Sequence, residues 1–531
     1  MKAGFEFQST SANNWQNVAP FRGSFRFDGR YAGHPFADFL VGTTSQTGRS
    51  NRNAELDMVS NRWSAYIQDD WKAARNLTIN LGLRYDFFGL FSNAKGDMSS
   101  WDVERKQVVL ISGVPDPRLV ARFPTIAGSE IGITPSNWYN NDRNNFGPRI
   151  GLAYRPLQSN LLVIRAAYGI YYNDVGGYSF LGMPSNPPFI TSETFDALPG
   201  NVPSLTFADP FPGDGRIPVG PRVAAWARNR VAPYQQQWNI TLESEIMKNT
   251  GLRISYIGNR GTKLDRVVPL NNSIPMPGNV QLNRPIQPFG PVNYQETGRN
   301  SILNSIQAGL IRRYSNGISF QVEYQFNKAL GENTFAAQPM DFRNARLDRG
   351  NLDYVRRHVT TANYVYDLPF GRGKALANDA PAVVNTLISG WQLSGILSVG
   401  TGEPFSPSFV STVVGWPSSR PDIVGDPELS NPSIRRWFNP GAFAVPAPFT
   451  FGNSARNELF GPGYFNWDAG LFKNTALTDR MSLEFRAEVF NLPNRANFGL
   501  PAANISVPAV VGTINSAADA RTFQFGLRLR Y

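Results

Sequence analysis

The chain has 531 residues, of which 41% are hydrophobic, and its formal net charge is +11. No window approaches the 18 apolar residues of a spanning helix, which excludes a helical membrane protein. The absence of cysteine and the presence of only two histidines exclude thiol catalysis, zinc ribbons and iron–sulfur sites. A membrane β-barrel remains compatible with this composition, because every second residue of its strands can be polar.

Aromatic residues make up 13% of the chain and accompany 48 Gly and 40 Pro, a composition that favours many strands joined by irregular loops. The cations are mostly arginine, which makes planar contacts with phosphate and carboxylate. Candidate anionic partners are therefore a solute or the phosphates of lipopolysaccharide. The arginines are scattered along the chain rather than clustered, which disfavours nucleic acid.

Apolar residues recur at every second position in segments from one end of the chain to the other, as in 77–87, 162–172, 318–326 and 481–489. Several segments reach the roughly 9–11 residues that a tilted strand needs to cross a bilayer. We predict fifteen strands, each start being within about three residues. They begin near residues 2, 21, 62, 76, 146, 161, 235, 250, 303, 317, 357, 390, 463, 480 and 521.

The connections between these strands alternate between short and long. Short ones include 247–249 and 313–317, long ones include 88–145 and 401–462, and 369–389 fits the alternation least well. Outer-membrane barrels have tight periplasmic turns and long external loops. The pattern therefore predicts an all-β fold, an antiparallel transmembrane β-barrel forming one domain over residues 1–531.

The odd strand number conflicts with the even numbers of closed bacterial barrels. The first residues, MKAGFEFQST, also lack the apolar segment and cleavage site of a secretion signal. Both observations predict that the N-terminal part of a longer protein is missing.

The last ten residues, TFQFGLRLRY, place an apolar or aromatic side chain at every second position, and the chain stops on an aromatic. We expect this face to contact lipid and the alternate face to line a lumen. The apolar positions are Phe523, Phe525, Leu527, Leu529 and Tyr531. The same alternation in other strands predicts lumen-facing charges at Arg84, Arg149, Arg165, Glu243, Glu323, Glu484, Arg486, Glu488, Arg528 and Arg530.

Two interpretations of these charges remain open. They can tune passage through a pore, or they can form ion pairs with one another or with a plug and hold the wall rigid.

Other motifs favour structural roles. Gly371, Gly373 and Lys374 lack the spacing and the hydroxyl residue of a phosphate loop, so we predict a turn. The segment with Asp341, Asp348 and Asp353 interleaves arginines, which predicts an ion-paired loop rather than a cation site. No carboxylate pair stands in a recognisable catalytic frame. We therefore predict no enzymatic activity, no metal site and no cofactor.

Several segments in this order resemble the barrel of TonB-dependent outer-membrane transporters, and the Oar-like branch resembles them best. The resemblance runs from about Phe21 to Tyr531. Its segments include RWSAYIQDDWKAARNLTINLGLRYD, NFGPRIGLAYRP, LVIRAAYGIYY, GWQLSGILSVGTGEPFS, EVFNLPNRANFG and FQFGLRLRY.

The resemblance implies a 22-stranded barrel in the outer membrane, a plug, and a TonB box that couples uptake to the proton-motive force. Full-length Oar-like members begin with a carboxypeptidase-regulatory-like domain. No plug, TonB box or regulatory-like domain is recognisable in this sequence, so TonB would act only through a missing part. The resemblance also implies that the barrel-assembly machinery reads the terminal strand, from Phe525 to Tyr531.

The function expected from this resemblance is solute binding by external loops and uptake through the lumen. A passive outer-membrane channel or structural barrel fragment is one alternative. A secreted soluble β-rich protein that binds carbohydrate is another, because the connection 401–462 is rich in aromatic residues.

Overall fold

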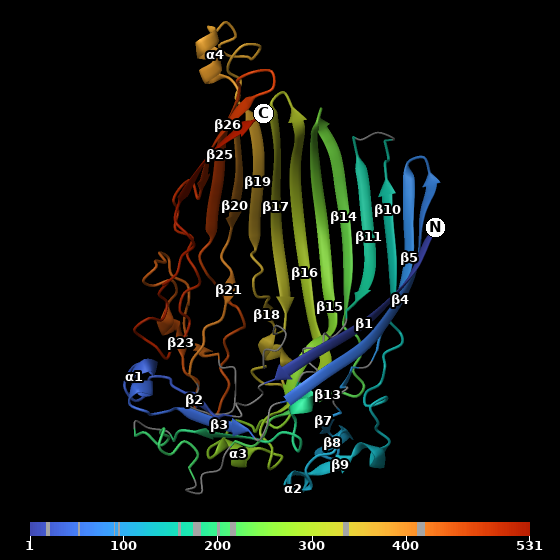
Figure 1. Cartoon of the computed structure of the whole chain (residues 1–531), viewed down its shortest axis with the longest axis vertical. Helices are drawn as coiled ribbons and strands as arrows, with labels where there is room; N and C mark the ends of the chain where they lie inside the picture. The colour runs from blue at the N-terminus through green and yellow to red at the C-terminus, as the bar shows by residue number, and fades with distance from the viewer. Residues whose placement is uncertain are drawn as a thin grey trace.

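A computed structural model describes residues 1–16, 22–50, 54–89, 91–93, 96–157, 161–173, 182–198, 202–212, 219–332, 339–410 and 420–531. The largest element of the fold is one long antiparallel sheet, which we call the wall, and Figure 1 shows it as a curved row of long strands. Among the described residues, no helix is both long and apolar enough to cross a bilayer.

Fourteen strands pair in succession to form the wall, and every neighbouring pair is antiparallel. No ladder joins the first strand to the last within the described part of the chain. In order, the strands are β1 (Lys2–Gln16), β4 (Ala54–Ala74), β5 (Leu77–Phe88), β10 (Phe146–Tyr154), β11 (Val163–Tyr172), β14 (Tyr234–Met247), β15 (Thr250–Pro269), β16 (Val292–Ser315), β17 (Ile318–Gly331), β19 (His358–Asp367), β20 (Trp391–Gly400), β25 (Tyr464–Ala476), β26 (Ser482–Phe490) and β27 (Thr522–Arg530).

The alternation of short and long connections is present in the structure. Short turns lie at one end of the wall and the long connections gather at the other, the lower end in Figure 1. The turn between β16 and β17 consists of Asn316 and Gly317, whose positive φ values of 51° and 78° suit a tight hairpin. The connection between β19 and β20 is the exception, because it contains the helix α4 (Ala382–Ile388).

Most predicted strand starts agree with the structure, and three differ. β4 begins at Ala54 rather than near 62, and β16 at Val292 rather than near 303. Strands of 21 and 24 residues exceed what a bilayer requires, so they run on where lipid no longer imposes alternation. The predicted strand near 21 is instead β2 (Ser24–Arg26), which pairs with β3 (Gln46–Ser50) outside the wall. The wall therefore has an even number of strands, and the odd number predicted from the sequence is wrong.

The two faces of the wall differ in chemistry, because directly opposed residues share a face. We call the face with Phe5, Trp63 and Phe525 the apolar face, and the opposite one the polar face. Phe5 is 69% exposed and Phe525 is 69% exposed, so no second protein layer covers them. Such a face suits hydrocarbon rather than water.

The long connections fold together into a second unit, which we call the cap. It contains the small sheets β2–β3–β12 (Ser192–Asp196) and β7 (Met98–Asp102)–β8 (Gln107–Ser112)–β9 (Thr125–Ala127). Its other elements are the helices α1 (Pro35–Leu40), α2 (Pro117–Val120) and α3 (Val280–Asn283), and the short strands β6 (Ser92–Asn93), β13 (Val223–Trp226), β18 (Gly350–Asn351), β21 (Pro404–Phe405), β22 (Asp422–Ile423), β23 (Phe443–Ala444) and β24 (Leu459–Phe460).

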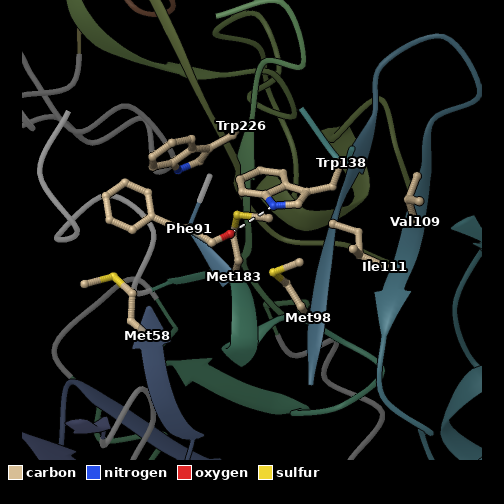
Figure 2. Packing of buried hydrophobic residues seen from close by; sticks show 8 residues of the cluster. All are labelled: Met58, Phe91, Met98, Val109, Ile111, Trp138, Met183 and Trp226. Atoms are coloured by element: carbon tan, nitrogen blue, oxygen red, sulfur yellow. Dashed lines mark hydrogen bonds between the residues drawn. The ribbon is translucent and has the colours of Figure 1, made fainter. Parts of the chain in front are cut away.

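The main hydrophobic clusters of the protein lie in the cap. One joins residues from two connections and one wall strand, and Figure 2 shows its side chains facing one another: Met58, Phe91, Met98, Val109, Ile111, Trp138, Met183 and Trp226. The indole nitrogen of Trp138 donates a hydrogen bond of 3.0 Å to the carbonyl of Phe91. A second cluster contains Trp101 and Phe289, and a third, in 401–463, contains Phe438. The cap therefore has the buried core that the wall lacks.

Candidate functional site

The strand registers place all ten predicted lumen-facing charges on the polar face of the wall. The pairing can be followed from Glu243 to Arg253, through Gly309 to Glu323, and onward across the sheet. The same alternation places Arg84 and Arg149 on this face of β5 and β10, and the last five charges on β26 and β27. That this face lines an aqueous lumen stays a prediction.

Ion pairs connect the strands of the polar face, both between adjacent strands and across the strand between them. Arg165 on β11 donates to Glu243 on β14 at 3.0 Å, and Arg253 on β15 donates to Glu323 on β17 at 2.8 Å. The side chains of Arg165 and Glu243 are 54% and 37% exposed, so solvent screens this pair. Each such pair contributes about 0–1 kcal/mol, and their number stiffens the wall more than any single one.

Charges also meet on the last strands and on the first strands of the wall. Near the chain's end, Glu484 accepts hydrogen bonds from Arg486 and Arg530. Arg528 lies directly opposite Glu484, and Glu488 lies between Gly470 and Gln524.

Among the first strands, Arg84 on β5 contacts Asp86 on the same strand at 2.8 Å and Glu6 on β1 at 3.3 Å. The guanidinium of Arg149 stacks over the ring of Tyr171 at 4.7 Å. The structure thus brings together two of the predicted sets, Arg165 with Glu243 and Glu484 with both of its arginines.

The acidic segment before β19 is an ion-paired loop, as predicted. Asp341 pairs with the nearby Arg343 at 2.8 Å, but Asp348 and Asp353 pair with arginines from the connection 401–463. Asp348 meets Arg420 at 3.0 Å with both side chains almost fully buried. Within the described ranges, no group of three His, Asp or Glu residues could hold a metal ion. These pairs fasten one part of the cap to another.

A cavity of about 260 Å³ lies where the wall meets the cap. Its lining includes Arg299, which is only 3% exposed, and Glu332, whose pKa is raised by burial although nearby arginines oppose the shift. The remaining lining residues are Asn173, Pro233, Tyr234, Gln235, Leu264, Asp265, Asn300, Ser301 and Leu352. Charges of both signs together with amides can hold a polar solute.

Sequence reasoning missed this cavity, because its residues come from three wall strands and two connections. Arg299 lies in the part of β16 that precedes the predicted start near 303. A charged residue just before the apolar alternation begins was the available signal.

The terminal apolar positions from Phe523 to Leu529 lie on the apolar face, where each opposes a hydrophobic residue of β26. Phe525 pairs with Ala487 and Leu527 with Phe485, and both side chains point away from the protein, with Leu527 being 71% exposed. Recognition of this strand by the barrel-assembly machinery stays a prediction.

A wall of amphipathic antiparallel strands with an uncovered apolar face defines an outer-membrane β-barrel protein. A family model confirms the class: residues 1–524 match the outer membrane beta barrel domain, and the chain belongs to this family. The predicted fold class and outer-membrane location are therefore confirmed. No curated protein matches the sequence.

Similar solved structures include the outer membrane transporter YddB from Escherichia coli, with a TM-score of 0.49 and 10% identity over 99% of this chain and 51% of that one. The ferripyoverdine receptor of Pseudomonas aeruginosa gives a TM-score of 0.44 and 10% identity over 90% of this chain and 39% of that one. The ferric-catecholate import receptor Fiu from E. coli K12 gives 0.42 and 12%, over 90% and 45%. The chain thus spans about half or less of these structures.

Proposed function

We propose that this chain is the barrel and external-loop part of a TonB-dependent receptor, in which the cap binds a solute and the polar face guides its uptake. The observation that carries the proposal is the position of the cap, because the long connections gather at one end of the wall and bury hydrophobic clusters there. An ordered cap at the end of a polar wall offers a binding surface, because binding residues are often carried on loops that a rigid scaffold positions.

The proposed step is binding and passage without chemical change of the solute. The cavity with Arg299 and Glu332 lies at the junction that a solute would cross between cap and lumen. Arginine supports an anionic solute as the first class to test. As the sequence resemblance implies, energy would come from TonB acting on a plug that is not recognisable in this sequence.

Binding to the purified chain in detergent tests this function. The probes are ferripyoverdine and a ferric catecholate complex, which are ligands of two of the similar solved receptors, together with inorganic phosphate and sucrose. We expect saturable quenching of tryptophan fluorescence by at least one anionic probe and none by sucrose. Trp138→Ala, which opens the cap core, should abolish the binding, whereas Val114→Ala at a site 94% exposed in the same connection should retain it.

The second candidate is a passive channel, which the extensive ion pairing of the polar face favours because it suits a rigid wall. Liposome swelling in neutral sugars of increasing size separates the two functions. Swelling rates that follow solute size alone, together with no saturable binding of any probe, would replace the receptor by the channel.

A further inference from the structure

Arg260 and Lys328 are cations on the apolar face of the wall, where most other positions are hydrophobic or aromatic. Arg260 on β15 lies directly between Gln236 on β14 and Ile302 on β16. Lys328 on β17 lies directly opposite Asn304 on β16. Both cations are exposed, and they flank β16 on its two sides at nearly the same height.

Neither cation has an ion pair or a side-chain hydrogen bond within the described residues, in contrast to Arg253 on the polar face. The apolar-face positions of residues 234–244, 250–260, 302–312 and 318–330 include no Asp or Glu. A negative partner for Arg260 and Lys328 must therefore come from outside this part of the protein.

The height of these cations on the wall indicates which environment they meet. Ile318 lies at the turn end of β17, and Lys328 lies ten residues further along the strand. Ten residues span roughly 33 Å along a strand, or about 25 Å across the bilayer at a tilt near 40°. This is about the height of the apolar band of outer-membrane barrels. Lys328 and Arg260 therefore lie at the external edge of that band.

Aromatic residues on the turn side of the two cations mark the same boundary. Tyr256 donates from its hydroxyl to Asn304 at 2.7 Å, and Tyr324 hydrogen-bonds to His358 at 2.8 Å. The indole of Trp238 lies over Gly258, where a Cβ atom would come within 2.0 Å of the ring. Tyrosine and tryptophan in this arrangement are typical of a membrane–water interface.

We propose that Arg260 and Lys328, with Asn304 between them, bind a phosphate group of lipopolysaccharide in the outer leaflet. Strands β15 and β17 are roughly 10 Å apart across β16, so the two long side chains can converge on one headgroup. The arginine supplies a planar fork of donors and the lysine a compact charge. The site is independent of the solute proposed for the cap.

The test measures binding of purified bisphosphorylated lipid A to the full chain in detergent by native mass spectrometry. Neutralising both cations, as Arg260→Gln with Lys328→Gln, should weaken binding about thirtyfold, equivalent to roughly 1 kcal/mol for each cation. The charge-conserving variant, Arg260→Lys with Lys328→Arg, should bind lipid A like the unmodified chain. Retained heat-modifiable gel mobility shows that each variant is folded.

The matched control is Arg312→Gln, on the same face of β16 but at the turn end, where Arg312 contacts Thr250. It should leave lipid A binding unchanged. Dephosphorylated lipid A should bind the unmodified chain as weakly as lipid A binds the double Gln variant. Inorganic phosphate at about 10 mM should not compete with lipid A, because it is a free anion and not part of a lipid surface. Equal lipid A binding by the folded double Gln variant and the unmodified chain would overturn the proposal, as would equal loss in Arg312→Gln. Full competition by inorganic phosphate would show an anion site without lipid specificity and would overturn it too.

Discussion

In the wall, aromatic and aliphatic side chains point outward and remain exposed, whereas in the cap the same residue types are buried. Phe525 on β27 is 69% exposed, and Met98 in the cap is fully buried. The difference follows from the surroundings, because hydrocarbon replaces protein as the apolar partner of the wall, while the cap must exclude water by its own packing.

The two regions also use charge differently. Wall pairs such as Arg165 with Glu243 are open to solvent, whereas the pair of Arg420 and Asp348 in the cap is almost fully buried. A solvated pair adds little stability, but a buried pair becomes costly when one partner is removed. Disruption of the wall should therefore affect membrane insertion, and disruption of the cap should affect local folding.

The largest effect is expected on the apolar face. Phe525→Asp and Leu527→Asp each place a carboxylate against hydrocarbon, and we expect both to abolish outer-membrane insertion, because a charge there costs up to roughly 2–4 kcal/mol for a cation at the midplane, somewhat less for a carboxylate, and less again toward the interface. The measurement is heat-modifiable gel mobility of the outer-membrane fraction. Gln524→Asp, on the polar face of the same strand, should insert normally. Normal mobility of both Asp variants at Phe525 and Leu527 would contradict lipid exposure.

Truncation in the cap core comes next. Trp138→Ala removes a side chain that is 3% exposed and the donor to the Phe91 carbonyl, and it should destabilise the cap by about 3–5 kcal/mol. Limited proteolysis should then cut the cap connections while the wall keeps its heat-modifiable mobility. Loss of both together would show that cap and wall fold as one unit.

The buried ion pair should give a similar effect with a different signature. Arg420→Met leaves the carboxylate of Asp348 buried without its cation, which costs about 3–5 kcal/mol, although the carboxylate still accepts from the Met340 amide at 2.9 Å. Replacing both residues with Met should recover most of the loss. The exposed pair of Arg30 and Asp28 is the control, since Arg30→Met should cost no more than about 1 kcal/mol. Protease resistance of the cap in urea measures all three variants.

The smallest effect concerns pH. Burial raises the pKa of Glu332 above its ordinary value, so the folded protein favours the protonated carboxyl. The stability from this group is present at pH values below the unfolded pKa and is lost as pH rises through the raised folded pKa. Glu332→Gln should therefore flatten the pH dependence of cap protease resistance at pH values above the ordinary pKa of a Glu side chain, about 4.3. An unchanged profile would mean that other groups control it.

Much of the wall could be predicted from the sequence. The starts of β5, β10, β14 and β15 lie within about three residues of those expected, because lipid on one face and polar surroundings on the other impose strict alternation. The starts of β4 and β16 were missed where these strands leave the membrane and enter the cap. The cavity around Arg299 was missed for the same reason.

Residue order alone determined the amphipathic strands, the alternation of short and long connections, and the face on which each charge lies, since all three depend on neighbours along the chain. Tertiary structure decided which connections share a core, which arginine meets Asp348, and which polar residues surround the cavity. These contacts join segments far apart in sequence, and no local periodicity encodes them.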